Sequence, residues 1–154
     1  MKMRRDTCLF CDIARGVEPA AIVYEDDDAM VIMDLFPITQ GHTLIIPKAH
    51  HVQMETMPEP LANHVFSLVR RTILAHKAAG WPAVAHNVLV NDGPDANQHV
   101  PHVHVHVIPR RGNDGLVAGV NMFTRMLRVW GLERRREALA DQASELRQHF
   151  PAVG

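Results

Sequence analysis

Residues 102–108 read His-Val-His-Val-His-Val-Ile, and this stretch decides the fold. Side chains two residues apart in a β-strand point to the same face of the sheet. The three histidines are therefore expected to line one face of a strand, while the intervening valines enter the core from the other face. We expect this strand to run from Val100 to Pro109.

Three interpretations of the histidine stripe are open from the residues alone. An exposed strand face tolerates histidine without using it, a metal-binding strand uses neutral imidazoles as ligands, and a catalytic strand needs one imidazole at the reacting atom. Geometry weakens the metal interpretation, because α-carbons four residues apart in a strand are separated by about 13 Å. His102 and His106 are then too far apart to share one ion with His104.

The composition bounds the class of protein. A chain of 154 residues with 47% hydrophobic and 21% charged residues is long enough for one well-packed domain. The formal net charge of −1 argues against nucleic acid and anionic membranes as partners, since both select for surfaces rich in Lys and Arg. The chain has no run of about 18 apolar residues, which predicts a soluble, cytoplasmic protein.

Hydrophobic patterning predicts five strands and three helices. Apolar residues at spacings of three and four between Pro58 and Ala79 indicate the main helix, and Gly80 and Pro82 end it. Arg110–Gly131 shows no clear period and is expected to be an irregular surface segment with room for a short helical turn. The remaining predicted elements are helices at 8–15 and 132–150, strands at 21–24, 29–33, 43–47 and 84–91, and a turn at 92–97.

This order of elements indicates an α+β domain with a mainly antiparallel five-stranded sheet, one long helix and a C-terminal helix. A parallel doubly wound sheet fits badly, because too few helices separate the strands. We expect a single domain over residues 1–154.

The chain resembles the histidine triad (HIT) superfamily, whose signature is His-φ-His-φ-His-φ-φ with φ an apolar residue. Residues 102–108 match this signature without exception, and further matches are spread over residues 8–111. These matches are Cys8-Leu-Phe-Cys-Asp-Ile13, Val23-Tyr-Glu-Asp26, Asp34, Gly41-His-Thr-Leu-Ile-Ile-Pro-Lys48, His50 and Asn91-Asp-Gly-Pro94. The resemblance implies a HIT-like fold with its core in residues 8–111 and a C-terminal extension in residues 112–154. It also implies a homodimer built around the long helix and a continuous sheet.

The resemblance further implies a mechanism at the three histidines. His104 matches the family nucleophile, which attacks the α-phosphorus of a nucleotide and forms a nucleotidyl-histidine intermediate that water hydrolyses. The backbone carbonyl of His102 orients this nucleophile, and His106 donates a hydrogen bond to a phosphate oxygen as charge develops. His42 supports the triad through a hydrogen-bond relay. No metal is required at the phosphorus.

A nucleotide site follows from the same resemblance. Asp34 matches the carboxylate that binds the ribose hydroxyls, and His104 and His106 contact the phosphate. The other matching positions are Leu9, Phe10, Ile13 and Ile32 in the base pocket, Leu35 beside the ribose, and Asn91 and Gln98 at the phosphate or leaving group. Taken alone, the apolar residues would be ordinary core.

Two positions depart from the family pattern. Asn97 stands where glycine is usual before Gln98, and His99 stands where serine or threonine usually donates to the bridging oxygen. His99 is a candidate replacement for that donor, and also a nucleotide-binding candidate. The preferred leaving group therefore stays open.

Cys8 and Cys11 have the Cys-x2-Cys spacing of one half of a zinc site, and they make a poor disulfide framework for a chain of this size. Reduced cysteines in a core turn and a redox pair are the alternatives, although the thioredoxin context of a redox pair is missing. Some bacterial HIT proteins close such a site with two histidines, so the resemblance implies a structural zinc. The nominated ligands are His50 and His102, with His51 and His99 in reserve.

Two classes of function are carried forward. The first is a hydrolase or transferase that attacks the α-phosphate of a purine nucleotide conjugate, either a dinucleoside polyphosphate or an adenosine phosphoramidate. The second is a nucleotide-binding or zinc-stabilised scaffold with weak catalysis. The intact nucleophile His104 argues for the enzyme, and Arg110 and Arg111, followed by a C-terminal helix, favour the dinucleoside polyphosphate.

Overall fold

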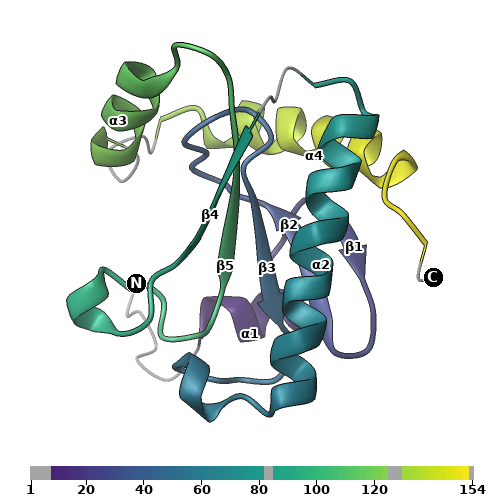
Figure 1. The fold of residues 1–154 in the computed structure, drawn as a ribbon, viewed down its shortest axis with the longest axis vertical. Helices are drawn as coiled ribbons and strands as arrows, with labels where there is room; N and C mark the ends of the chain where they lie inside the picture. The colour runs from purple at the N-terminus through teal and green to yellow at the C-terminus, as the bar shows by residue number, and fades with distance from the viewer. Residues whose placement is uncertain (1–7, 82–84, 125–129, 153–154) are drawn as a thin grey trace.

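The computed structural model describes residues 8–81, 85–124 and 130–152, and Figure 1 shows their arrangement around a central sheet. The helices are α1 (Leu9–Ala14), α2 (Glu59–Ala78), α3 (Gly115–Thr124) and α4 (Leu132–Gln148), with 3-10 turns at Met54–Thr56 and Pro94–Ala96. The strands are β1 (Ile22–Glu25), β2 (Ala29–Met33), β3 (Thr43–Pro47), β4 (Ala85–Val90) and β5 (Val105–Arg110). Pro82 and Val84, expected at a helix end and a strand start, lie outside the described residues.

The five strands form one antiparallel sheet in the order β1-β2-β3-β5-β4. This confirms the predicted α+β class and its five-stranded sheet. All five residues of β3, in the middle of the sheet, are buried. Its pairing with β5 places Leu44 opposite His106. The segment that follows His42 therefore lies beside the strand that carries the last histidine of the triad.

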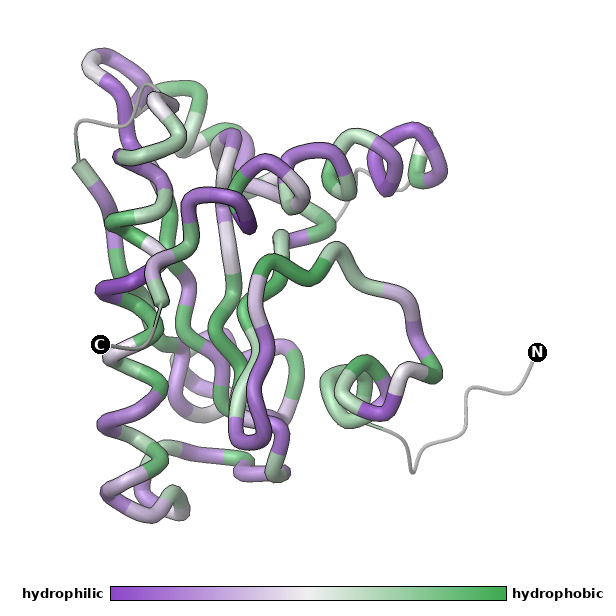
Figure 2. Tube along the Cα trace, turned by 90° about the vertical axis from the view of Figure 1, so that its right-hand side faces the viewer, coloured by the Kyte–Doolittle hydropathy of each residue, from purple (hydrophilic) through white to green (hydrophobic). Residues whose placement is uncertain are grey.

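Alternation along the strands produces a core on each face of the sheet. The main core lies against α2 and α4 and includes Val31 and Ile45. The second core lies on the opposite face, where Ile32 and Leu44 pack with Phe10 of α1. Figure 2, turned by 90° from Figure 1, shows the long helix on one side of the sheet and α1, close to the N-terminus, on the other.

The long helix α2 forms because its apolar residues repeat at helical spacing. Its buried side chains include Val65, Leu68 and Val69. Proline in the first turn fits the helix start, and Gly80 just past the end adopts a φ of +69°, which favours glycine. The predicted helix is confirmed with one residue fewer at each end. No helix in the described part of the chain is long and apolar enough to cross a membrane.

The strand expected from Val100 to Pro109 is wrong in its first half, because β5 begins at Val105. The backbone N–H of His102 donates to the carbonyl of Val100 at 2.8 Å, which closes a tight turn. The backbone N–H of Val103 donates to the carbonyl of His51 at 2.7 Å. His51 lies in a loop and not in a strand. His106 lies in β5, and the other two histidines precede it.

The segment Arg110–Gly131, expected to be irregular with room for a short helical turn, contains the ten-residue helix α3. The prediction failed because α3 has no charged residue and its apolar side chains are distributed around the helix, so the sequence shows no helical period. The helix is anchored where Ala118 packs with Ile38 and Ile108. Asn121 strengthens this contact by donating from Nδ2 to the carbonyl of Ile38 at 2.7 Å.

Candidate active site and metal centre

The three histidines of the triad are buried on the α1 side of the sheet. Their exposed fractions are 0% for His102, 7% for His104 and 6% for His106, so the expected stripe is not a solvated face. The intervening valines belong to the main core, as the alternation predicts. Polar rings at this depth require hydrogen-bond partners, and those partners fix which ring nitrogen carries the proton.

His104 is oriented by the backbone of the residue two positions before it. Its Nδ1 lies 2.8 Å from the carbonyl oxygen of His102. A carbonyl oxygen accepts but does not donate, so Nδ1 of His104 carries the proton and donates it. In the neutral ring the lone pair is then on Nε2. This tautomer is the one that a nucleophile needs, because the lone pair is on the nitrogen away from the backbone.

A second chain of hydrogen bonds begins at the backbone N–H of Ile38, which donates to Nδ1 of His42 at 3.1 Å. Because Nδ1 accepts, the neutral His42 ring carries its proton on Nε2, which lies 2.9 Å from Nδ1 of His106. His106 thus accepts at Nδ1 and holds its own proton on Nε2. A donor at this position suits a phosphate oxygen, so the geometry fits the relay expected for His42.

Asp34 lies beside this relay. Its carboxylate is buried, Oδ1 accepts from the backbone N–H of Phe36 at 2.8 Å, and Oδ2 lies 3.4 Å from Nε2 of His42. Nδ1 of His106 is 3.9 Å from the same carboxylate oxygen. The expected contact of Asp34 with the ribose stays a prediction. A bound ribose would have to share this carboxylate with the two histidines that it already faces.

Asp34, His42 and His106 are close enough together to be considered as metal ligands. The hydrogen bond from Ile38 argues against this use. Because Nδ1 of His42 accepts that bond, a metal at Nε2 would have to displace the proton of the ring and leave an imidazolate. The arrangement is better suited to passing a hydrogen bond than to holding an ion.

The expected base-pocket residues come together only in part. Phe10, Ile13 and Ile32 share the second core, and the rings of Phe10 and His104 meet edge to face with their centres 5.0 Å apart. Leu9, at the start of α1, is 47% exposed. Leu35, expected beside the ribose, is partly buried against the main core. An apolar wall next to His104 is therefore present, and it is built by α1 and β2.

The backbone conformation of Asn97 explains why asparagine can stand where the family usually has glycine. Its backbone is left-handed, with φ 61° and ψ 34°. Glycine adopts this region freely, and asparagine tolerates it better than most other residues. Asparagine can therefore replace the usual glycine without changing the shape of the loop.

Gln98 stabilises the loop between β4 and β5 through two hydrogen bonds of its side chain. Its Oε1 accepts from the backbone N–H of Gly93 at 2.8 Å, and its Nε2 donates to the carbonyl of Val52 at 2.7 Å. Asn91 donates from Nδ2 to the carbonyl of Asn97 at 3.4 Å, and His99 is exposed. The phosphate contacts expected for these three side chains stay predictions, and the structure gives Gln98 a loop-holding role in addition.

Arg110 and Arg111 already have partners at the start of α3. The guanidinium of Arg110 bonds both carboxylate oxygens of Asp114, at 2.6 Å for the shortest contact, and also Oδ1 of Asn87. Arg111 donates to Oε1 of Gln40 at 2.7 Å. A second phosphate bound by these two arginines would have to compete with these interactions.

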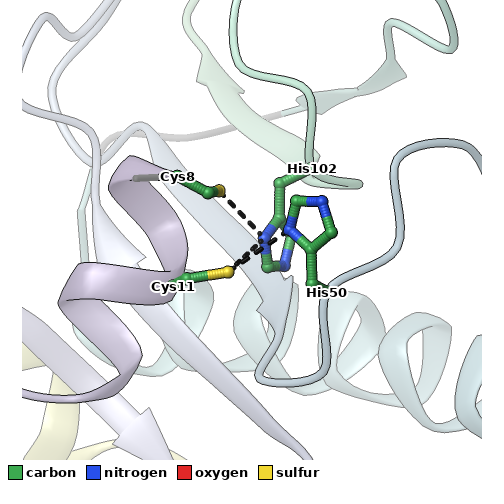
Figure 3. Close-up of side chains that lie close together, drawn as sticks. All are labelled: Cys8, Cys11, His50 and His102. Atoms are coloured by element: carbon green, nitrogen blue, oxygen red, sulfur yellow. Dashed lines mark hydrogen bonds between the residues drawn. The ribbon is translucent and has the colours of Figure 1, made fainter. Parts of the chain in front are cut away.

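The four nominated metal ligands converge, as Figure 3 shows. Cys8 and Cys11 come from α1 and the residue before it, His50 from the loop after β3, and His102 from the turn before β5. The donor atoms all lie within 4.8 Å of one another. Neither reserve ligand, His51 or His99, belongs to this group, and Nδ1 of His51 contacts the hydroxyl of Thr56.

The geometry of this cluster fits a tetrahedral ion. Sulfur-to-Nδ1 distances are 3.4 Å for Cys8–His102, 3.6 Å for Cys11–His102 and 3.3 Å for Cys11–His50. Tetrahedral zinc with its usual bond lengths separates sulfur and nitrogen ligands by about 3.5 Å. Nε2 of His102 donates to the carbonyl of Pro47 at 2.8 Å, which leaves the lone pair on Nδ1 facing the cysteines.

Electrostatics also suit a metal at this cluster. Burial lowers the pKa of the His102 imidazole, which keeps the ring neutral and able to act as a ligand. Burial and the neighbouring Cys8 raise the pKa of the Cys11 thiol, so a cation is needed to hold the two sulfurs together as thiolates. The residues could therefore bind a metal ion in a closed Cys2His2 site.

Sequence reasoning missed the backbone groups that set the ring tautomers. The carbonyl of Pro47 and the N–H of Ile38 fix the rings of His102 and His42, and neither group has a signature in the side-chain pattern. The contact of Phe10 with His104 was also missed. The position of Phe10 between the two cysteines of the motif was the available signal for it.

These features are those of a histidine triad protein. The family model described as "HIT domain" matches residues 15–113, so the chain belongs to this family. An adenylylsulfatase of Arabidopsis thaliana is 37% identical over 128 residues, which cover 81% of this chain and 63% of the relative. An adenosine 5′-monophosphoramidase of Saccharomyces cerevisiae is 34% identical over 113 residues, or 73% of this chain and 68% of the relative.

The structural comparison agrees with the sequence comparison. A zinc-bound histidine triad family protein from Mycobacterium smegmatis is similar over 92% of this chain and 96% of its own, with a TM-score of 0.72 and 34% identity. Family membership and the names of the two relatives support a nucleotide hydrolase of the HIT type.

Proposed function

We propose that the protein hydrolyses conjugates of AMP, with His104 as the nucleophile. The observation that carries the proposal is the 2.8 Å contact between Nδ1 of His104 and the carbonyl of His102. It puts the lone pair on Nε2, where a phosphorus–nitrogen bond can form. As that bond forms the ring becomes cationic, and the hydrogen bond from Nδ1 to the carbonyl strengthens with the charge.

In the first step the bond from Nε2 to the α-phosphorus forms while the bond from phosphorus to the leaving group breaks. The leaving group keeps the electron pair of that bond, and an amine leaving group also takes up a proton, which is balanced by the proton that water releases in the second step. His106, with its proton on Nε2, donates to a phosphate oxygen on which negative charge increases. In the second step water attacks phosphorus, releases AMP, and returns the electron pair of the phosphorus–nitrogen bond to His104.

The substrate class follows from the relatives and from the charges at the site. Relatives named for adenylyl sulfate and for an AMP phosphoramidate share an adenosine 5′-phosphoryl group and differ in the group attached to it. The ion pair of Arg110 with Asp114 leaves that cation less suited to a second nucleotide. We therefore place an adenosine phosphoramidate ahead of a dinucleoside polyphosphate as the preferred substrate.

Zinc is the metal that we assign to Cys8, Cys11, His50 and His102. Two sulfurs and two imidazoles at tetrahedral spacing are a typical structural zinc set. The ion would link α1, which carries the apolar wall, to the turn that carries the nucleophile. The ion would not contact the phosphate or take part in the reaction at phosphorus.

We also propose a homodimer. Within the described residues β4 pairs on one side only, with β5, so it forms an edge of the sheet. Val88 on this edge and Phe66 on α2 are exposed apolar side chains. A second copy adding its β4 would continue the sheet and cover such residues. Sedimentation at micromolar concentration tests this, and a monomer under those conditions contradicts it.

A substrate panel tests the enzyme against the scaffold. An adenosine phosphoramidate, adenylyl sulfate and diadenosine polyphosphates are presented to wild type, to His104→Ala and to His149→Ala, whose imidazole is exposed and distant in sequence from the triad. We expect turnover by wild type and by His149→Ala, and a loss of about a thousandfold or more in His104→Ala. Equal turnover by all three proteins contradicts the covalent mechanism, and AMP binding without any turnover favours the scaffold.

A further inference from the structure

A stack of rings at the end of α2 has no part in the mechanism above. His76 is fully buried, and its ring lies nearly parallel to those of His86 and Trp81, with centres 5.2 Å and 5.6 Å away. Nδ1 of His76 is 3.2 Å from Nε2 of His86. Nε2 of His76 makes no hydrogen bond of normal geometry among the described residues, although the backbone of Gly41 is close enough to act on the ring. The buried ring therefore lies against the backbone of Gly41 as well as against two aromatic rings.

Trp81 connects the stack to the loop before β3. Gly41 has a φ of +84°, and a Cβ added to it would lie 2.8 Å from the indole ring of Trp81 and 3.1 Å from Cγ of Pro109. No side chain fits there, and the left-handed φ is one that glycine adopts without strain. The peptide of Gly41 is therefore confined between the indole and Pro109.

The next residue is His42, so this confinement bears directly on the relay. The backbone N–H of His42 donates to the carbonyl of Thr39 at 3.2 Å, and the hydroxyl of Thr39 donates to the carbonyl of Pro109 at 2.7 Å. The N–H of Ile38, in the same turn, fixes the tautomer of the His42 ring. If the turn moves, the 2.9 Å contact between His42 and His106 lengthens and the tautomers are no longer defined.

We propose that Trp81, backed by His76, is a positioning residue for the proposed reaction: it holds Gly41 and thereby keeps the hydrogen bond from His42 to His106 in place. This inference rests on the proposed function, because the relay matters for rate only if His106 serves the phosphate. Trp81 touches neither the relay rings nor the triad in any contact that the structure shows, and it acts through the backbone of Gly41.

The charge state of His76 suits this role. Burial, and next the neighbouring His86, lower the pKa of His76 to about 3, although the backbone of Gly41 acts in the opposite direction. The ring is therefore neutral under ordinary conditions. A neutral stack places no positive charge next to His42, whose Nδ1 must stay unprotonated to accept from Ile38.

Kinetics of four proteins test the proposal: Trp81→Ala, Trp81→Phe, His42→Ala and the double variant Trp81→Ala/His42→Ala. Trp130→Ala is the matched control, since this indole is 87% exposed. We expect Trp81→Ala to lower kcat by about tenfold to a hundredfold with little change in KM, and Trp81→Phe to restore most of the loss. In the His42→Ala background the same substitution should change kcat no further. Losses that multiply, or an effect on KM alone, overturn the proposal.

A second readout does not depend on activity. Nitrogen-15 spectra of the imidazoles report which ring nitrogen carries the proton. Wild type and Trp130→Ala should show His42 and His106 as Nε2-protonated tautomers, and Trp81→Ala should show mixed tautomers at both while remaining folded by circular dichroism. Unchanged tautomers in Trp81→Ala overturn the proposal. If Trp81→Ala does not fold, Trp81→Leu undergoes the same measurement. Shifted tautomers in a protein whose wild type hydrolyses no AMP conjugate would contradict the proposed function and with it the effect on rate, while the hold of Trp81 on the hydrogen bond from His42 to His106 would stand.

Discussion

His104 donates from Nδ1 to the backbone carbonyl of His102 at 2.8 Å, while the ring of His102 faces Cys8 and Cys11 through its own Nδ1. One residue therefore contributes its carbonyl to the candidate nucleophile and its side chain to the candidate metal site. Phe10 lies against both rings, with centres 5.8 Å from His102 and 5.0 Å from His104. Whatever fixes α1 and His102 also fixes the direction of the His104 ring.

Metal removal should therefore lower stability and turnover together. We expect about one zinc per chain in wild type and in His51→Ala, and none in His50→Ala, because His50 lies in the ligand cluster and the ring of His51 lies outside it. Elemental analysis measures the metal, and thermal unfolding should show a lower Tm for His50→Ala. Equal zinc content in the two variants would remove His50 from the site.

Loss of the relay should reduce kcat in a defined order. Removing the donor at the phosphate with His106→Ala should cost about a hundredfold to a thousandfold in kcat. His42→Ala should cost less, since His42 acts through His106 and leaves that ring in place. Steady-state kinetics at saturating substrate provide the comparison. A larger loss for His42→Ala than for His106→Ala is incompatible with the relay.

The left-handed backbone of Asn97 predicts a contrast between two substitutions. Asn97→Gly should leave the free energy of unfolding nearly unchanged, because glycine adopts a φ of 61° freely. Asn97→Val should lose about 1–2 kcal/mol, since a β-branched residue is strained there. Urea denaturation measures both values. Equal stability of the two variants would mean that the loop changes conformation at no cost.

The buried His76 predicts a pH dependence of stability. Its pKa is lowered from 6.5 to about 3 in the folded protein, so the unfolded chain binds the proton first as the pH falls. The contribution of the neutral His76 ring to the free energy of unfolding is fully present above about pH 6.5. It is lost progressively between pH 6.5 and 3, where the free energy of unfolding falls by up to about 1.4 kcal/mol per pH unit.

Comparing wild type with His76→Phe at pH 7 and pH 5 isolates this effect, because the metal ligands titrate in the same way in both proteins. His86 and His42 act on the His76 ring, and Lys77 acts on His86, and all three remain in place in the variant. We expect the free energy of unfolding of wild type to fall more steeply than that of His76→Phe. Parallel curves would show that His76 is not kept neutral by the fold.

Much of the fold was predictable because local and tertiary signals agree. β2 and β3 are short apolar runs bounded by turn-forming residues, and both are confirmed at the predicted residues. α2 has an amphipathic period and stop signals at its end. The convergence of Cys8 and Cys11 with two histidines followed from the resemblance to a family, since the cysteine spacing alone left three uses open.

The errors have a physical cause as well. Alternation from His102 onward correctly assigns the valines to the main core and the histidines to the other face. Facing a core does not require sheet pairing, however, and the N–H of Val103 donates to His51 outside the sheet. The sequence of α3 shows no amphipathic period because the exposed side of the helix is apolar too. The tautomers of the site depend on carbonyl and N–H groups, such as that of Pro47, which every residue type can supply.

The stereochemistry of hydrolysis at phosphorus tests the central claim most directly. The substrate is an adenosine 5′-phosphorothioate conjugate of one configuration, hydrolysed in oxygen-18 water by the wild-type protein. Attack by His104 followed by attack of water inverts phosphorus twice, so the account predicts net retention of configuration. Net inversion would mean that water attacks directly, and it would contradict the covalent intermediate on His104.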